Sequence, residues 1–394
     1  MVTDMNRRSF IKLTTGGVVL AAGAAIGWRY AERNLFPVPD SALSAWTEAG
    51  TPEDISRFVL SYAVLAPNSH NKQPWIADIS TAGEIGLSLD TARLLPQTDP
   101  FNRQMMMSLG TFLELLVMAA AERGHRAELE LFPEGAPGET VDRRRLVTVR
   151  LVPDSGTARD PLFAAVLDRR TDRRAYDPSR PVTAAQVATL VEAAAPYEVL
   201  AGVVTDPTRV AVIRDIANSA WRSELLTERT FMESAEVLRI GTTEIDRHRD
   251  GIVIDDPFVV LLERSGLFDR TVMPAPDSVA MRGQLDEFAE ITEATPAYLW
   301  IVTTGNSRAQ QIDAGRAYVR MNLAGTALGL AMHPNQQALQ EFPEVAGDYT
   351  AIHNALNAPA PEHTVQMLAR LGHLPASEVP LRPSPRRGVA AQIA

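Results

Sequence analysis

The chain has 394 residues, of which 45% are hydrophobic and 22% charged, a composition typical of a folded protein with roughly two to three domain units. Its net charge of −10 provides no overall positive field, so we predict no nucleic-acid partner. The absence of cysteine excludes disulfides, thiolate nucleophiles and cysteine-ligated metal clusters.

The first thirty residues are typical of a targeting segment. The paired arginines Arg7 and Arg8 precede an apolar run at 13–26, which is shorter than the roughly 20 residues that a spanning helix needs. The pair resembles a twin-arginine leader, so we predict that residues 1–30 direct export through the twin-arginine translocase. The mature protein would be periplasmic, or anchored in the membrane by an uncleaved leader. An ordinary secretory signal and an amphipathic N-terminal helix remain alternatives.

The first half of the mature chain, residues 45–155, combines two helices with short strands. Thr51, Pro52 and Asp54 predict the capped start of a helix that Pro67 ends. A second, longer helix is predicted over 102–123, stopped by a glycine. Alternating segments predict four strands, at 75–79, 85–89, 127–131 and 146–151.

The second half, residues 160–390, repeats this order of elements. Its predicted helices begin at Asp160–Pro161, at Thr183, at Asp206–Pro207 and at Ser307, and its strands cover 199–204 and 298–303. Glycine and proline are frequent over 240–285, which predicts an irregular excursion serving as a lid or a binding loop.

The long helices of the two halves carry glycines at matching positions. Gly110 and Gly124 in the first have the same spacing as Gly315 and Gly329 in the second. A glycine inside a helix costs about 1 kcal/mol relative to alanine, so we predict close packing at Gly110 and Gly315. The match favours an internal duplication, with chance as the alternative.

Four short segments carry the candidate chemistry. The turn at 66–75 offers backbone N–H groups and short polar side chains, which suit the edge of a heteroaromatic ligand. The segment 168–176 gathers arginines whose planar forks match phosphate. Segment 332–337 and the arginine-bearing tail at 383–387 complete the set. The alternative for each is a solvated turn or a free chain end.

Two of these segments resemble a known family. Residues 66–75, Ala-Pro-Asn-Ser-His-Asn-Lys-Gln-Pro-Trp, resemble the Ala-Pro-Ser-x-x-Asn-x-Gln-Pro-Trp signature of the nitroreductase superfamily. Residues 169–173 resemble its Arg-Arg-Ser-x-Arg flavin-phosphate motif. Because the arginine motif here opens the second half, the chain resembles the Acg-like branch, in which two nitroreductase units are fused. The resemblance implies an α+β fold of two tandem sheet-plus-helix units that form an intramolecular pseudo-dimer.

The resemblance also implies FMN as the cofactor. Ribityl and phosphate oxygens would be held by Arg169, Arg170, Thr171 and Arg173, with Arg386 or Arg387 from the tail. The isoalloxazine edge would be touched by Pro67, Asn68, Ser69 and His70 from the other half. Backbone N–H groups near the reactive flavin nitrogen would come from Pro334, Asn335 and Gln336. The first half has no arginine motif before Pro67, so we expect one flavin site for each chain.

The function implied is two-electron reduction of a small nitroaromatic or quinone-like acceptor, with no catalytic side chain because the flavin carries the chemistry. NAD(P)H is a possible electron donor, but an exported enzyme would not meet it. The alternative is an exported protein that binds or sequesters FMN under a lid with little turnover. We expect no metal site, since the seven histidines include no His-Glu-x-x-His pattern. A chain that contains its own pseudo-dimer is expected to be a monomer or a weak oligomer.

Overall fold

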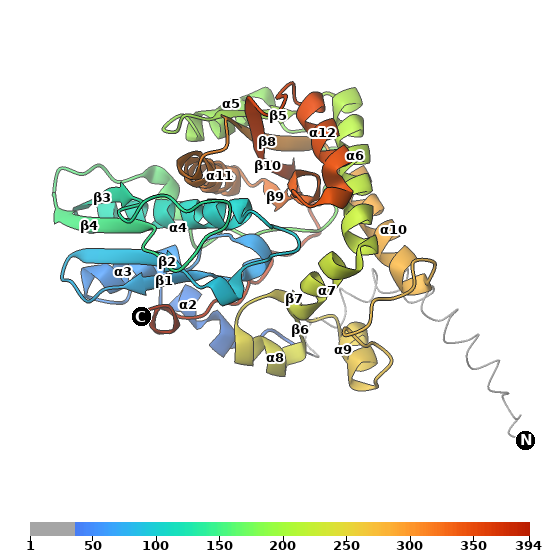
Figure 1. Ribbon diagram of the computed structural model, residues 1–394, viewed down its shortest axis with the longest axis horizontal. Helices are drawn as coiled ribbons and strands as arrows, with labels where there is room; N and C mark the ends of the chain where they lie inside the picture. Colours follow the sequence, from blue (N-terminus) through green and yellow to red (C-terminus); the bar gives the residue numbers. More distant parts are fainter. Residues whose placement is uncertain (1–35) are drawn as a thin grey trace, which may run out of the picture.

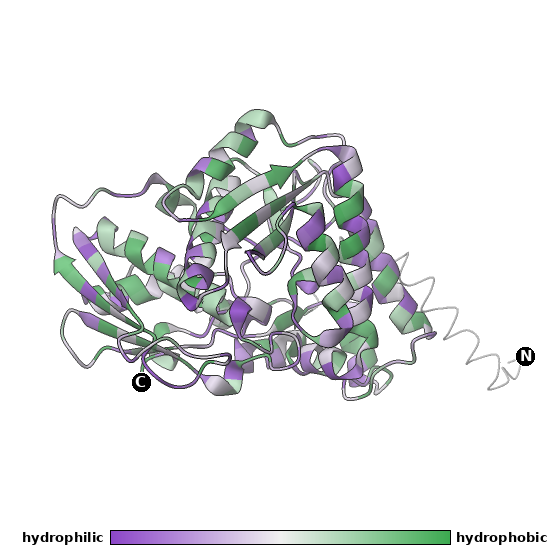
Figure 2. Cartoon of the chain, turned by 45° about the horizontal axis from the view of Figure 1, so that its top comes forward, coloured by the Kyte–Doolittle hydropathy of each residue, from purple (hydrophilic) through white to green (hydrophobic). Residues whose placement is uncertain are grey.

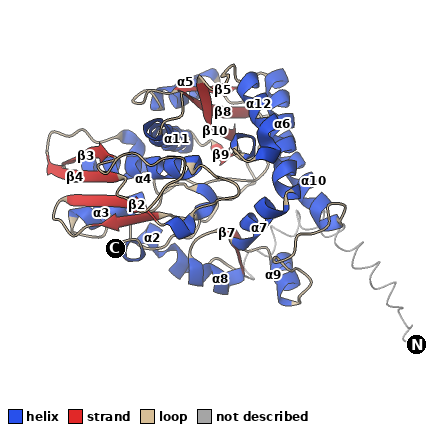
Figure 3. Ribbon diagram, viewed as in Figure 1, coloured by secondary structure: helices blue, strands red, loops and turns tan. Residues whose placement is uncertain are grey.

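The computed structural model describes residues 36–394, so the predicted export leader lies outside the described residues. Two four-stranded antiparallel sheets with helices packed around them form the body of the protein (Figure 1). Figure 3 shows how these helices surround and separate the two sheets. The predicted α+β class is confirmed.

The first sheet has the strand order β1-β2-β4-β3. Its strands are β1 (Trp75–Asp78), β2 (Glu84–Leu89), β3 (His125–Leu131) and β4 (Val147–Pro153). The helices α2 (Ser44–Thr47) and α3 (Ile55–Ala63) precede β1, and α4 (Arg103–Glu122) connects β2 to β3. The alternation predicted at Ile85, Leu87 and Leu89 places these side chains in the core, where all three are buried.

The second sheet has the strand order β5-β8-β10-β9. Its strands are β5 (Leu200–Val204), β8 (Ala297–Thr304), β9 (Ala331–Pro334) and β10 (His363–Gly372). The helix α5 (Ala184–Ala193) precedes β5, α11 (Arg308–Ala327) connects β8 to β9, and α12 (Ala346–Ala355) lies between β9 and β10. In both sheets the spatial order is therefore first, second, fourth, third strand, with a long helix between the second and third. Figure 2 shows hydrophobic stretches along the strands of both sheets and hydrophilic residues over the outer helices.

The helices α4 and α11 cross at their glycines in the middle of the molecule (Figure 1). A Cβ atom on Gly110 would overlap the carbonyl oxygen of Ile312, and one on Gly315 would overlap that of Met107. The predicted close packing is thus confirmed, and it is reciprocal. The helix α4 is long and apolar enough to cross a membrane, but 89% of its apolar window is buried inside the protein, as in the core helix of a globular domain.

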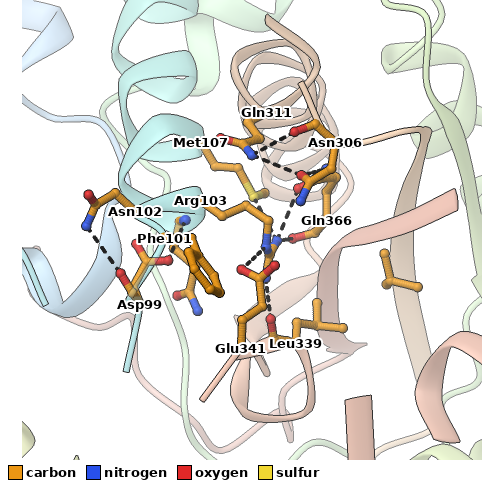
Figure 4. A network of polar contacts seen from close by, with 12 residues as sticks. Asp99, Phe101, Asn102, Arg103, Met107, Asn306, Gln311, Leu339, Glu341 and Gln366 are labelled. Atoms are coloured by element: carbon orange, nitrogen blue, oxygen red, sulfur yellow. Dashed lines mark hydrogen bonds and ion pairs between the residues drawn. The ribbon is translucent and has the colours of Figure 1, made fainter. Parts of the chain in front are cut away.

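Each of the two long helices begins with an arginine that reaches into the opposite half. Arg103 donates to the carbonyl oxygens of Leu339 and Gln366 and pairs with Glu341 (Figure 4). Arg308 donates to the carbonyl oxygens of Gly138, Glu139 and Phe101. Both arginines bind the loop between the third and fourth strands of the other sheet, so they join the two halves at both ends of the crossing.

The segment between β5 and β8 is a large, mostly helical insertion. It contains α6 (Pro207–Leu226), α7 (Glu228–Glu236), β6 (Leu238–Ile240), α8 (Gly241–His248), β7 (Ile252–Ile254), α9 (Pro257–Arg264) and α10 (Val279–Glu293). The prediction of irregular chain over 240–285 is wrong for α8, β7, α9 and the start of α10, and it is confirmed for the loop 265–278. The lid role of this segment stays a prediction. Pro257 follows the capping residue Asp256 at the start of α9, Gly241 begins α8 with a positive φ, and Gly283 lies inside α10.

The helix starts test the capping signals directly. Thr183 and Ser307 form capping boxes, and the Asp160 side chain caps a short 3₁₀ helix, as predicted. Thr51 is not a cap, because the carboxylate of Asp54 accepts the hydrogen bond from the N–H of Arg57 and the helix begins at Ile55. The short 3₁₀ helices are η1 (Asp40–Leu43), η2 (Ser69–Asn71), η3 (Thr91–Arg93), η4 (Pro161–Ala165), η5 (Gln337–Leu339), η6 (Pro343–Val345) and η7 (Val389–Ala391).

The C-terminal tail returns to the first half. The N–H of Ala77 donates to the carbonyl of Gln392 over 2.7 Å, and the N–H of Ala394 donates to that of Ala77 over 2.9 Å. Ile393 thereby forms a parallel bridge at the outer edge of β1. The chain that leaves the second sheet is therefore fixed to the first, and it carries Arg386 and Arg387 along the way.

The helix crossing leads to a stability prediction. Gly315→Ala would force a Cβ atom onto the backbone of α4, so it should destabilise the protein by about 3 kcal/mol or more in urea unfolding. Gly283→Ala is the matched control: it lies in α10 with no atom near the new Cβ, and should stabilise by about 0.5–1 kcal/mol. A Gly315→Ala protein as stable as the control would contradict the close crossing.

Candidate functional site

The predicted arginine segment, the polar turn and the tail meet at the end of α3. Arg169, from the second half, donates to the carbonyl oxygen of Leu65 over 3.3 Å. Arg386, from the tail, donates to the same oxygen over 3.3 Å and to that of Ala66 over 3.2 Å. Residues more than 200 positions apart in the sequence are thus brought together at one carbonyl group.

The turn after α3 has a strained backbone. His70, Asn71 and Gln73 all have positive φ angles of 46–52°, a region that costs non-glycine residues of order 1–3 kcal/mol each. Side chains support this conformation: the carboxamide oxygen of Asn68 accepts from the N–H of Gln73 over 2.8 Å, and the hydroxyl of Ser108 accepts from the N–H of Ser69 over 3.2 Å. Pro67 begins the turn, and its carbonyl accepts from the Thr111 hydroxyl.

The tail completes the support of this turn. Arg386 donates to the side-chain oxygen of Asn71 over 2.7 Å, and the Asn71 amide donates to the carbonyl of Pro385 over 3.0 Å. The N–H of Arg387 donates to the side chain of Gln73 over 2.8 Å, and its guanidinium donates to the carbonyl of Gln73 over 2.6 Å. The tail is therefore part of the folded core, and both of its arginines reach the turn.

The charge at this meeting point is not balanced. Arg169 and Arg386 are each only 2% exposed, and within residues 36–394 neither forms an ion pair with a carboxylate. Burial lowers the pKa of Arg169 to about 10, and burial together with the charges of Arg169 and Arg170 lowers the pKa of Arg386 well below its usual range. Buried charges in proteins are normally paired. Two guanidiniums in this position indicate a binding site for an anion.

The neighbouring residues of the arginine segment differ in exposure. Arg170 is half-buried, donates to the carbonyl of Leu381 over 3.1 Å and lies 5.1 Å from the ring centre of Trp46. Thr171 is half-buried in the same segment. Arg173 is exposed, yet its pKa is lowered by desolvation. The segment therefore contains one buried arginine, Arg169, and one exposed arginine, Arg173, four residues apart.

Two histidines lie close to Arg173. Burial, followed by the charge of Arg173, lowers the pKa of His70 to about 4 and that of His333 well below its ordinary value. Both imidazoles are therefore neutral at physiological pH. The N–H of Asp172 also donates to the carbonyl of Met332 over 3.0 Å. These contacts place the arginine segment between the turn at 67–71 and the segment at 332–336.

The third predicted segment contributes unpaired polar atoms. Pro334 ends β9, and the N–H of Asn335 donates to the carbonyl of Leu368 over 2.8 Å. The side-chain oxygens of Asn335 and Gln336 are buried without a hydrogen-bond partner among residues 36–394. Six predicted site residues carry such atoms: His70, Arg169, Asn335, Gln336, Arg386 and Arg387. Buried polar groups are normally satisfied, so these donors and acceptors fit a polar, anionic ligand such as FMN.

Three residues at the site were missed by sequence reasoning. Trp46 lies beneath the guanidiniums of Arg170 and Arg386, at 5.1 and 5.5 Å from its ring centre. The side chain of Asn322 accepts from Arg169 over 3.4 Å, and the hydroxyl of Tyr318, one turn earlier on α11, is buried without a partner. The spacing of Tyr318 and Asn322 on one helix face was the available signal, but apolar neighbours concealed it.

A buried carboxyl group lies next to the third segment. Glu224, on α6 of the insertion, accepts from the Gln340 amide over 2.9 Å and from the Ser234 hydroxyl over 3.4 Å. Burial raises the pKa of Glu224 to about 7. The insertion therefore places an ionisable group against the loop that follows the candidate site.

These observations define an α+β protein with two similarly built sheets and a candidate anion site between them. Residues 166–373, more than half of the chain, match the Nitroreductase family, and the chain belongs to that family. A relative in Mycobacterium tuberculosis H37Rv, named as an NAD(P)H nitroreductase, is 29% identical over 351 residues, which cover 86% of this chain and 90% of the relative. The protein named acg in the same organism is 25% identical over 359 residues, covering 85% and 94%.

Solved structures with similar folds share less of the sequence. The FMN-dependent nitroreductase NfnB of Mycobacterium smegmatis, in complex with NADPH, is 18% identical and covers 57% of this chain and 92% of its own, with a TM-score of 0.36. A nitroreductase with bound FMN from Bacteroides fragilis is 14% identical and covers 58% of this chain and 97% of its own, with a TM-score of 0.34.

The unbalanced charge yields a prediction about the ligand-free protein. Arg169→Met should leave its free energy of unfolding unchanged or raise it by about 1–2 kcal/mol, because an unpaired buried charge is removed. Inorganic phosphate should stabilise the wild type but not this variant in thermal unfolding at constant ionic strength. Arg144→Met, which removes an exposed arginine paired with Asp142, should behave like the wild type. A variant that phosphate still stabilises would contradict the anion site.

The raised pKa of Glu224 predicts how stability depends on pH. Its folded pKa of about 7 exceeds the ordinary value of 4.5, so the folded state holds a proton that the unfolded chain releases. Stability should therefore fall as pH rises from 4.5 to 7, by about 3 kcal/mol from this group. Glu224→Gln should remove this decline in urea unfolding at pH 5 and pH 8. A smaller decline from Asp99, whose pKa is raised to about 6, should remain in both proteins. If the free energy of unfolding fell equally with pH in the wild type and in Glu224→Gln, the raised pKa of Glu224 would be refuted.

Proposed function

We propose that this chain is an FMN-binding oxidoreductase of nitroreductase type that transfers two electrons to a small nitroaromatic or quinone-like acceptor. The observation that carries this proposal is the pair of buried guanidiniums, Arg169 and Arg386, which form no ion pair with a carboxylate in the described part of the chain. A phosphate group would supply the missing negative charge and accept hydrogen bonds from both. Membership of the Nitroreductase family and relatives named as NAD(P)H nitroreductases support the same assignment.

The chain's own residues would bind and orient the flavin. Arg169, Arg170, Thr171 and the tail arginines Arg386 and Arg387 would hold phosphate and ribityl oxygens. The strained turn, Pro67 to His70, would present backbone groups and a neutral imidazole to the edge of the ring, and Pro334 to Gln336 would do so from the second half. Bound FMN would supply the electron transfer.

Arg173 would act differently from the buried arginines. It is exposed and lies beside two imidazoles, His70 and His333, that stay neutral at physiological pH. Its guanidinium would donate a charged hydrogen bond to ribityl or phosphate oxygens of FMN. No side chain is assigned as a catalytic acid or base.

We further propose that residues 45–155 and 160–390 are tandem nitroreductase units that form a pseudo-dimer within one chain, as in the Acg-like branch. Their matched strand orders support this, as does the helix crossing. Met107 meets Gly315 and Gly110 meets Ile312, which is the self-complementary pattern of a two-fold interface when Gly110 is matched with Gly315. A chain built this way would be a monomer or a weak oligomer.

The pseudo-dimer would hold one flavin rather than two. Thr111, beside the strained turn, corresponds to Arg316 in the other half. Arg316 and Arg320 there pair with the buried carboxylate of Glu114 at 2.9 Å, and Arg320 also pairs with Asp160 at 2.6 Å. These arginines are balanced by carboxylates, in contrast to Arg169 and Arg386. The counterpart region therefore has no free positive charge for a phosphate.

Reduction by NAD(P)H distinguishes the proposed enzyme from the alternative function. The alternative is an exported protein that binds or sequesters FMN with little NAD(P)H-dependent turnover. The leader would send the protein through the twin-arginine translocase to the periplasm, or hold it at the membrane, away from cytoplasmic NAD(P)H. The insertion favours restricted access, because the N–H of Gly251 donates to the carbonyl of Asn71 over 3.1 Å and the amide of Gln73 donates to that of Arg249 over 2.9 Å. Anaerobic mixing with NADPH decides between them: bleaching of the yellow protein within seconds supports the enzyme, and persistent colour supports sequestration or another donor.

Arg173→Ala tests the placement of the flavin. One charged hydrogen bond contributes about 1.5–3 kcal/mol, so the variant should bind FMN roughly ten- to a hundredfold more weakly in a fluorescence titration. Arg143→Ala, at an exposed arginine of the first half, should leave the affinity unchanged. Equal affinities for the Arg173→Ala protein and the wild type would contradict the assignment.

A further inference from the structure

One short segment of the insertion exposes an unusual share of the apolar side chains. Eight large hydrophobic side chains are exposed within residues 36–394, and three of them lie at the end of α9 and in the loop that follows it. We call Leu261, Leu267 and Val272 the α9 patch; they are 51%, 72% and 60% exposed. Three such side chains within one segment of twelve residues are more than the single, scattered apolar side chains of an ordinary surface, and they indicate a contact with another apolar phase.

The α9 patch belongs to an ordered element. Val260, on the inner side of α9, is buried. The carbonyl of Leu262 accepts from the N–H of Leu267 over 2.9 Å and from that of Phe268 over 3.1 Å, which closes the turn after the helix. The patch is therefore presented outward by a defined backbone, and its exposure is a property of the fold.

The segment that carries the α9 patch has no net charge that could attract a charged partner. The segment that carries it, 257–274, contains two acidic residues, Glu263 and Asp269, and two basic residues, Arg264 and Arg270. Arg270 is also paired with Glu244. The segment is thus neutral overall, so a partner would be attracted by apolar burial rather than by electrostatics.

The chain enters the described structure beside this patch. The guanidinium of Arg264, on α9, lies 4.7 Å from the ring centre of Phe36. The apolar run of the leader ends at Ile26, and the chain from there to Phe36 can span at most about 35 Å when fully extended. A folded body of this size is roughly 50 Å across. A membrane that held residues 13–26 would therefore lie close to the end of the molecule that carries α9.

We propose that the α9 patch inserts into the interfacial region of the membrane that holds the uncleaved leader, so that Leu261, Leu267 and Val272 lie among lipid chains. The inference requires the leader to be retained and is independent of the flavin assignment. A lipid surface fits better than a protein partner, because three side chains supply far less than the roughly 800 Å² that each partner buries in a stable protein interface.

The lack of cysteine allows a direct test on the full chain. A single Leu267→Cys substitution would carry a fluorescent label on the patch, and Leu200→Cys would be the matched control, since Leu200 is also exposed, at 54%. Leu200 lies on β5, at the opposite end of the molecule from α9 (Figure 1). Both proteins would be reconstituted into phosphatidylcholine vesicles with lipids that carry a quencher in their acyl chains.

The proposal predicts strong quenching of the label at 267 and none at 200. A label at 267 that stays as exposed to water as the label at 200 would overturn it. So would a label at 267 that is shielded from water but not quenched by lipid, because the patch would then be covered by the leader or by a second copy of the chain.

A second variant tests the apolar contact itself. With the label at Val272→Cys, adding Leu261→Asp and Leu267→Asp should reduce quenching at least tenfold, whereas adding Leu200→Asp should not change it. Because the patch is neutral, added salt and anionic lipids should leave the quenching unaltered. Quenching that disappears at high salt would overturn apolar insertion.

Discussion

The candidate site is built around positive charge that, within residues 36–394, is buried without a carboxylate partner. Arg169 and Arg386 come from different ends of the chain and donate to the same carbonyl oxygen of Leu65. An unpaired buried guanidinium is costly unless the fold holds it in place for a ligand. The strained turn at 67–73, the returning tail and the arginine segment are the elements that hold these two side chains. Each of them is braced by the others, so the site is assembled only when both halves of the chain are folded.

The helix crossing provides the rigid frame for that assembly. Because Gly110 and Gly315 have no side chains, α4 and α11 approach until backbone meets backbone. Arg103, seen in Figure 4, and Arg308 then fix the ends of the crossing to the opposite half. The polar turn follows α3, which packs on α4, and Asn322 and Tyr318 project from α11. A small shift of this crossing would therefore separate the residues that surround Arg169.

Local signals in the sequence predicted much of this arrangement. Capping boxes at Thr183 and Ser307 involve residues three positions apart, so sequence alone located those helix starts. The four motif segments were identified from their residue types, whereas their convergence was implied by a family resemblance. Of the helices in the insertion, α6 was predicted from its start at Asp206–Pro207, whereas α8 and α9 were not, because short helices with glycine or proline at their ends resemble irregular chain in sequence. Trp46 and Asn322 were missed for another reason: they reach the site through contacts between distant elements, which no local pattern records.

The most direct test of the account compares FMN with riboflavin, which has the same ring system but no phosphate. In calorimetric titrations of the flavin-free protein, two charged hydrogen-bond donors in a buried site should make FMN bind at least about a hundredfold more tightly than riboflavin. Equal affinities for the two flavins would show that the buried guanidiniums do not bind the phosphate, and would contradict the central claim.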